Sequence, residues 1–61
     1  ANDDPKLAVE ALTKGCELGE PTACFQLSVM LAEGKGVKKK DPAGAAAAKK
    51  KACDAGLKEA C

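Results

Sequence analysis

Apolar residues recur at helical spacing in three stretches of the chain, at about residues 5–18, 22–33 and 42–55. The first stripe, with charged residues largely opposite, consists of Leu7, Ala8, Ala11, Leu12 and Gly15. The second stretch has a wider apolar surface that includes Phe25, the one aromatic residue, so we expect this helix at the centre of the core. In the third stretch, the residues expected to face inward are Ala45, Ala48 and Ala52. The pattern predicts an all-α chain with three helices.

Capping residues mark the ends of these helices. Asp4 and Asp41 each precede a proline, and an aspartate N-cap followed by proline in the first turn is a strong helix start. The second helix begins less well, because Glu20 is not a favoured N-cap, although its charge suits the helix dipole. Gly19 and Gly56 can adopt the left-handed conformation that closes a helix.

Residues 34–40 are predicted as a loop, since two glycines frame a break and the lysine run has no apolar period. The loop contains Gly-x-Gly, but no strand precedes it and no Gly-Lys-Ser/Thr follows, which argues against a phosphate-binding loop. We expect Val37, its one apolar residue, to fold back over the ends of the helices. Residues 57–61 then predict a short C-terminal helical turn, the first turn of a fourth helix.

The chain repeats itself at an offset of 37 residues. The matching pairs are Asp4 and Asp41, Ala8 and Ala45, Cys16 and Cys53, Gly19 and Gly56, and Cys24 and Cys61. A fixed period of roughly twenty to fifty residues is typical of solenoids, in which helical pairs bury their apolar faces by stacking on neighbours. We therefore expect a fragment of an α/α solenoid built from helix-turn-helix repeats.

Composition makes disulfide bonds the expected source of stability. The chain has 61 residues, and thirteen of its apolar residues are alanines, so a core that is already marginal at this size has little area to bury. The chain has four cysteines and no histidine. Seven residues separate the members of each cysteine pair, unlike the closer spacing of zinc ligands.

Four cysteines allow three pairings. Cys16 and Cys24 lie symmetrically about a Gly-x-Pro break, at similar height in an antiparallel helix pair, so the geometry favours Cys16–Cys24 and, by the repeat, Cys53–Cys61. Each bridge would close a nine-residue loop, worth about 2.5 kcal/mol in the chain-entropy model. The alternative is four reduced, buried cysteines that act as small hydrophobic residues in a cytosolic protein.

Persistent disulfides imply an oxidising compartment, so we expect a secreted or periplasmic protein. The sequence has no apolar signal core and no run long enough to span a bilayer. It begins without an initiator methionine, so either a leader has been removed or the sequence is an excerpt of a longer chain, and its end a few residues into a predicted helix favours the excerpt.

Three runs of residues carry a family resemblance: Ala-Cys-Phe-Gln-Leu at 23–27, Gly-x-Gly-Val-x-Lys at 34–39, and Lys-Lys-Ala-Cys-Asp-Ala-Gly at 50–56. Together they resemble the Sel-one-like repeats, a branch of the tetratricopeptide-type helical solenoids. More narrowly, the chain is similar to the cysteine-rich bacterial members, in which a disulfide between cysteines with this spacing staples each repeat. The resemblance covers nearly the whole chain.

The resemblance implies a division into three units. Residues 1–19 would be the second helix of a preceding repeat, residues 20–56 one complete repeat, and residues 57–61 the start of the next. It also implies stacked helix pairs, no catalysis in most members, and a role as adaptor or scaffold in protein complexes. Some cysteine-rich relatives are credited with binding β-lactams, so small-ligand binding or hydrolysis of that type is the alternative.

The expected binding site is one face of the second helix, at spacings of four, three and four: Thr22, Gln26, Val29 and Glu33. An enzyme is disfavoured, because the chain has no histidine and no carboxylates that spacing would force into one site. Ser28 has no partner base in the sequence and is better explained as a packing residue. The cysteines also lack the Cys-x-x-Cys spacing of reactive thiols. We expect a non-catalytic module that binds a protein or peptide, without cofactor or metal.

Charge is unevenly distributed along the chain. Residues 1–34 have a net charge of −4 and residues 35–61 of +5, within a total of +1. The basic half is a candidate for binding anionic surfaces. Without arginine or interleaved aromatic residues, we do not expect nucleic-acid recognition. The two halves could also meet head to tail, which predicts self-association that weakens with salt.

Overall fold

The computed structural model describes residues 4–61, and within that range every regular element is helical. Residues 1–3, which open the predicted unit 1–19, lie outside it. The elements are α1 (Pro5–Glu17), α2 (Pro21–Glu33), α3 (Pro42–Asp54) and one 3₁₀ turn, η1 (Lys58–Ala60). The predicted all-α fold of three helices and a C-terminal helical turn is confirmed, although the turn at its end is 3₁₀ and not α-helical.

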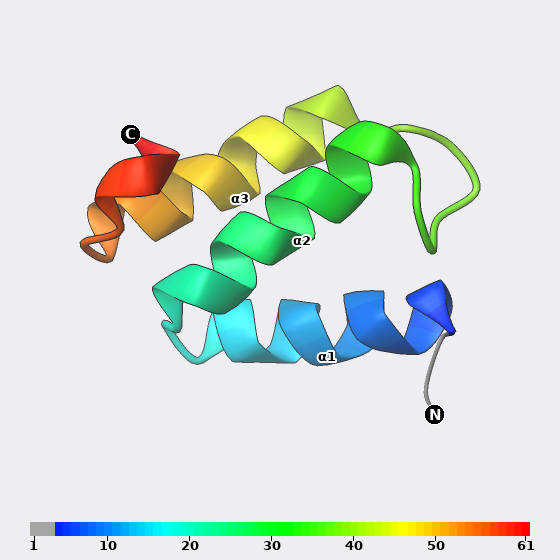
Figure 1. Cartoon of the computed structure of the whole chain (residues 1–61), viewed down its shortest axis with the longest axis horizontal. Coiled ribbons are helices and arrows are strands. Elements are labelled where there is room, and N and C mark those ends of the chain that lie inside the picture. The colour runs from blue at the N-terminus through cyan, green and yellow to red at the C-terminus, as the bar shows by residue number, and fades with distance from the viewer. Residues whose placement is uncertain (1–3) are drawn as a thin grey trace.

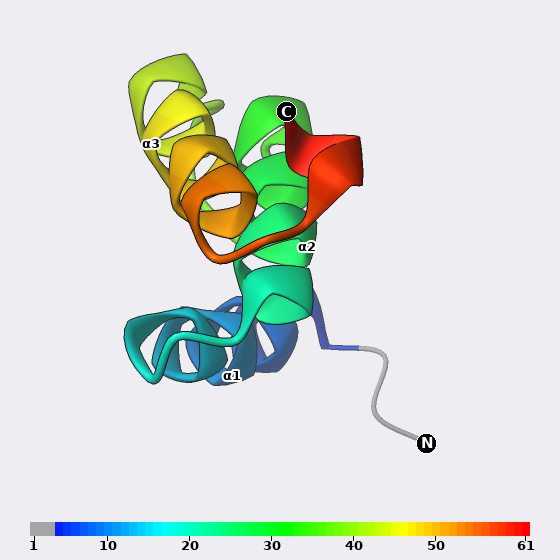
Figure 2. The same ribbon diagram turned by 90° about the vertical axis from the view of Figure 1, so that its left-hand side faces the viewer.

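Helix α2 lies between the other two helices. It packs against α1 on one side and α3 on the other, whereas α1 and α3 touch each other little (Figures 1 and 2). The buried residues of α2 are Ala23, Cys24, Leu27 and Ser28. The prediction that the second helix forms the centre of the core is therefore confirmed.

The helix starts differ in the way the sequence predicts. The Asp4 carboxylate accepts a hydrogen bond from the Lys6 backbone N–H at 2.9 Å, and the Asp41 carboxylate accepts one from the Gly44 N–H at 3.0 Å. At the start of α2, the Glu20 side chain makes no such bond. Two of the three helices thus begin with a side-chain cap, and the central one does not.

The turns after α1 and α3 have the same backbone geometry. Both contain a glycine with positive φ, at 91° for Gly19 and 109° for Gly56. Two hydrogen bonds of 3.0 Å recur at the two turns: Gly19 N–H to Cys16 O and Glu20 N–H to Gly15 O at the first, Gly56 N–H to Cys53 O and Leu57 N–H to Ala52 O at the second. The 37-residue offset therefore repeats backbone structure as well as residue types.

The inward face of α1 differs from the predicted stripe. Leu7 is 50% exposed, and Ala8 and Ala11 are exposed as well. The residues of α1 that pack into or against the core are Val9, Leu12 and Cys16. Both sets follow helical spacing, so α1 has two apolar faces. The disulfide decides between them, because Cys16 has to face α2 to reach Cys24.

The alanines of α3 face inward as predicted. Ala45, Ala48 and Ala52 are 8%, 5% and 0% exposed, respectively. Their small side chains let α3 approach α2 closely, but each contributes little apolar area. The disulfides and the larger residues of α2 have to supply the rest of the stabilisation.

The loop at residues 34–40 returns to the start of α1 (Figure 1). Gly36 has φ of 77° and lies against the Pro5 backbone and the Val9 side chain, where no β-carbon would fit. Val37 is half-buried and lines a hollow of about 490 Å³ beside the first turn of α1. The loop thus folds back over one helix end, as predicted for Val37.

Candidate functional site

Both predicted disulfides are present. The Cα atoms are 4.5 Å apart in Cys16–Cys24 and 5.0 Å apart in Cys53–Cys61, and no cysteine is free. The alternative of four reduced cysteines is therefore wrong. Cys16 and Cys24 are buried, whereas Cys61 is exposed and Cys53 half-buried. The first bridge belongs to the core, and the second holds η1 to the end of α3 at the surface.

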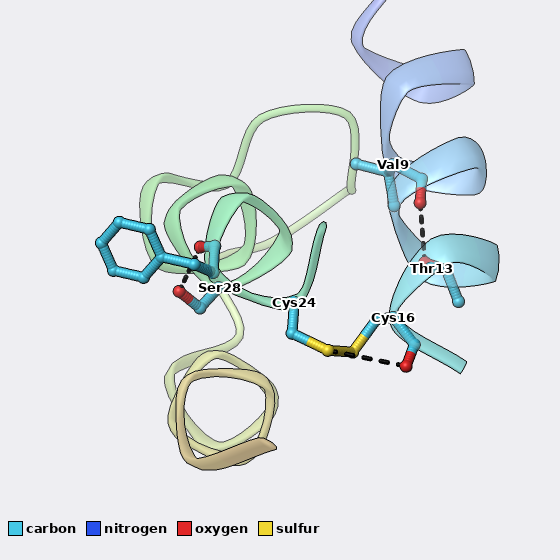
Figure 3. Close-up of a disulfide and its surroundings, with 6 residues drawn as sticks. Val9, Thr13, Cys16, Cys24 and Ser28 are labelled. Carbon is cyan, nitrogen blue, oxygen red and sulfur yellow. Dashed lines mark hydrogen bonds between the residues drawn. A yellow bond between two sulfur atoms is a disulfide. The ribbon is translucent and has the colours of Figure 1, made fainter. Parts of the chain in front are cut away.

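Figure 3 shows the buried bridge between α1 and α2. Thr13, one turn before Cys16, donates its hydroxyl to the Val9 carbonyl at 2.7 Å and so satisfies its polar group within α1. The Cys24 sulfur lies 3.6 Å from the Cys16 carbonyl oxygen, and because a bridged sulfur carries no proton, this is a contact and not a donated hydrogen bond. Burial limits access of an attacking thiolate, so this bridge is structural.

The predicted binding face of α2 is accessible along its whole length. Its members are all exposed: Thr22, Gln26, Val29 and Glu33. Val29 places a large apolar side chain in solvent, at 41% exposure. The Glu33 carboxylate lies 3.3 Å from the Lys35 ammonium, and both side chains are more than half exposed, so this ion pair adds little stability and leaves the face free.

A shallow groove of about 340 Å³ runs between α2 and α3 beside this face. It is lined by Phe25, Ser28, Val29, Ala32, Ala45, Ala46 and Lys49. Val29 belongs both to the face and to the groove, so the two form one continuous surface. Lys49 is the one charged residue of the lining, and it is exposed, so its aliphatic stem can follow the apolar surface while the ammonium stays in water.

Sequence reasoning missed the groove because it needs residues from two helices. The pattern assigns Phe25 to the core, and in the structure Phe25 packs against the core while its other side forms a wall of the groove. The sequence held part of the information, since the one aromatic residue, Phe25, is combined with a run of alanines in α3 that are too small to cover it. The relative placement of α2 and α3 determines that Ala46 is the opposing residue.

Ser28 has the environment of a packing residue. It is 5% exposed, and its hydroxyl donates to the Phe25 carbonyl in the preceding turn. Among residues 4–61, no three histidine, cysteine, aspartate or glutamate side chains gather in a way that could hold a metal ion. No helix in the same range is long and apolar enough to cross a membrane.

The basic and acidic halves of the chain occupy different elements. The exposed lysines of the second half are on the loop, on α3 and on η1: Lys35, Lys38, Lys39, Lys40, Lys49, Lys50, Lys51 and Lys58. The acidic residues of α1, of the turn after it and of the end of α2 are Glu10, Glu17, Glu20 and Glu33, whereas Asp41, Asp54 and Glu59 adjoin the lysines of the second half. Helices α1 and α3 lie on opposite sides of α2 (Figure 1), but the two halves meet at the loop, where the Glu33 carboxylate lies 3.3 Å from the Lys35 ammonium.

The surface formed by the exposed face of α2 and the adjoining groove is thus the best-defined candidate site of the described residues. The resemblance to Sel-one-like repeats depends on the residue runs at 23–27, 34–39 and 50–56. No protein-family model, curated protein or solved structure matches the chain.

Proposed function

We propose that this chain is a non-catalytic helical-repeat module that binds a protein or peptide through α2. The observation that carries the proposal is the continuous surface made by the exposed α2 face and the groove beside it. Helix α2 is packed from both sides and bridged to α1. A surface on so constrained a helix loses little conformational entropy on binding.

The chemistry of the surface favours one kind of partner. The groove has apolar walls, with Phe25 and Val29 on α2 facing Ala46 on α3, and Lys49 stands at its edge. An apolar side chain followed by an acidic group would use both features. The chain has no tryptophan, tyrosine or arginine, the residues that dominate binding hot spots. A single unit therefore binds weakly, and useful affinity comes from several units acting together.

The proposal includes the family and the compartment. The three residue runs and the repeated turn geometry support one complete Sel-one-like repeat at 20–56, flanked by the second helix of another repeat at 1–19 and the start of a third at 57–61. The two disulfides support a secreted or periplasmic location, since such bonds persist where the environment is oxidising.

The test compares partners captured by the immobilised chain with those captured by a variant of the α2 face. The variant carries Gln26→Ala, Val29→Ala and Glu33→Ala, all at exposed positions, so the fold should be retained. We expect the variant to lose the specific partners of the parent chain. If both retain the same partners, the α2 face is not the binding site.

A matched control changes the charged face of α1. Lys6, Glu10 and Lys14 are exposed and do not line the groove, so replacing them by alanine alters as many surface side chains without touching it. This control should capture the same partners as the parent chain. Loss of partners in both triple variants would indicate a general effect of surface charge and would remove the proposal.

A second candidate, favoured by the exposed lysines, is binding of anionic surfaces or of the acidic half of another copy. Both depend on screened electrostatics and should weaken steeply as ionic strength rises. The measurements are sedimentation of the chain alone, and with vesicles of anionic lipid, at low and high salt. If the chain sediments as a monomer at both salt concentrations and does not sediment with the vesicles, this candidate is ruled out.

A further inference from the structure

Helix α1 has an apolar face that the described residues leave uncovered. This outer face of α1 consists of Leu7, Ala8 and Ala11, which are all exposed. Leu18, 79% exposed, extends it beyond the end of the helix. The opposite apolar face, which includes Val9, packs against the core.

The internal repeat identifies what covers the same face elsewhere in the molecule. At the 37-residue offset, Ala8 and Ala11 correspond to Ala45 and Ala48 of α3, and Leu7 corresponds to Gly44. Ala45 and Ala48 are buried, and the helix that packs on α3 is α2. The outer face of α1 is therefore the sequence equivalent of a face that, in α3, is already an interface with α2.

The converse comparison shows that the two ends of the molecule are not alike. The α1 residues that pack toward α2 are Val9, Leu12 and Cys16, and their equivalents in α3 are Ala46, Lys49 and Cys53. Ala46 and Lys49 are exposed, and Lys50 beside them is exposed too. On this side α3 therefore carries lysines and one wall of the groove beside α2. The outer face of α1 is instead apolar, and an uncovered apolar face is typical of an interface.

We infer that the outer face of α1 docks an amphipathic helix with the apolar pattern of α2, placed on α1 as α2 is placed on α3. The small residues Ala8 and Ala11 allow the same close approach that Ala45 and Ala48 allow on α3. A second copy of the described fold does not fit this role, because its own α2 is already covered by α1 and α3. The inference does not depend on the partner-binding role of the α2 face.

The test supplies such a helix in the register of the repeat. A copy of residues 20–37 is joined directly before Ala1, so that the copied α2 stands 37 residues before the original. Cys24→Ala in the copied segment alone avoids an additional thiol. We expect the thermal midpoint, followed by circular dichroism, to rise by about 5 °C or more relative to the 61-residue chain.

The matched control is the same extension with Leu27→Lys and Leu31→Lys in the copied segment only. These changes remove the large apolar residues that would pack on α1 and leave the length of the extension unchanged. The control should unfold at the midpoint of the chain without an extension. Equal midpoints for the two extended chains overturn the inference.

Two substitutions on α1 then locate the contact. Ala11→Lys lies on the outer face and Glu10→Lys on the charged face, and both positions are exposed in the 61-residue chain. Ala11→Lys should change the midpoint little in that chain and abolish the gain in the extended one, whereas Glu10→Lys should act equally in both. If Ala11→Lys changes the thermal midpoint equally in the two chains, the inference is overturned. It is also overturned if the 61-residue chain forms a dimer that Ala11→Lys dissociates, since a second copy would then cover the face.

Discussion

A β-carbon placed on Gly15 of α1 would lie 2.9 Å from the β-carbon of Ala23 on α2. The two helices therefore cross too closely for any side chain at position 15. The neighbouring Cys16–Cys24 bridge holds them at this separation, with Cα atoms 4.5 Å apart. Gly15 thus serves interhelical packing, at a position where helix propensity alone would favour alanine.

Gly15→Ala should destabilise the protein although alanine is the better helix former. The propensity gain of about 1 kcal/mol is outweighed by overpacking that costs roughly 1–3 kcal/mol. Urea unfolding measures the difference. Adding Ala23→Gly should relieve the clash, so the double variant should lose clearly less than the sum of the two single losses. If the loss of the double variant equals the sum of the two single losses, the helices move apart at no cost in free energy.

Glu20→Asp should stabilise α2. Glu20 occupies the N-cap without a side-chain hydrogen bond, whereas Asp4 and Asp41 both accept one at the equivalent place in their helices. The shorter carboxylate can reach the free backbone N–H groups and keeps the charge. We expect a gain of about 0.5–1 kcal/mol in the free energy of unfolding. Asp41→Glu is the matched reverse change and should lose a similar amount.

The two disulfides should contribute unequally to stability. Each pair has a sequence separation of 8, so the loop-closure contribution is the same, about 2.5 kcal/mol. Replacing Cys16 and Cys24 by alanine also leaves a space in the core, which adds about 1 kcal/mol. Replacing Cys53 and Cys61 removes sulfur from a half-buried and an exposed position. Urea midpoints of the two double variants should therefore differ, with the core pair lower, and equal midpoints would refute this ranking.

Limited trypsin digestion should cut first in the loop between α2 and α3. Lys38, Lys39 and Lys40 are exposed and outside any helix, whereas cutting at the lysines of α3 requires local unfolding. Cys16–Cys24 lies wholly before the loop and Cys53–Cys61 wholly after it. Mass spectrometry under denaturing, non-reducing conditions should therefore show two separate fragments. Fragments that remain joined until reduction would contradict the disulfide pairing.

Much of the local structure could be predicted from particular residues. The Asp-Pro pairs and the glycines at 19 and 56 mark helix ends within a residue or two, because capping depends on neighbours in the sequence. The disulfide partners also follow from their symmetric spacing about a turn. The four residues of the α2 face lie on one exposed side of the helix, since their spacing is set by one helix alone, and their role in binding stays a prediction.

The groove was not predictable in the same way, because Phe25 and Ala46 come from different helices and meet only when α3 packs on α2. Periodicity also failed on α1, where Ala8 and Val9 belong to different apolar faces and both satisfy helical spacing. A helical pattern shows which residues share a face but not which face has a neighbour.

The amino-acid sequence by itself determined three helices, their ends and the cysteines that pair across each turn, since all of these depend on residues close together in the chain. The tertiary structure alone decided which face of α1 turns toward α2 and which remains open. Helical spacing alone fits either apolar face of α1, and the packing of Val9 and Leu12 against the core shows which face is covered.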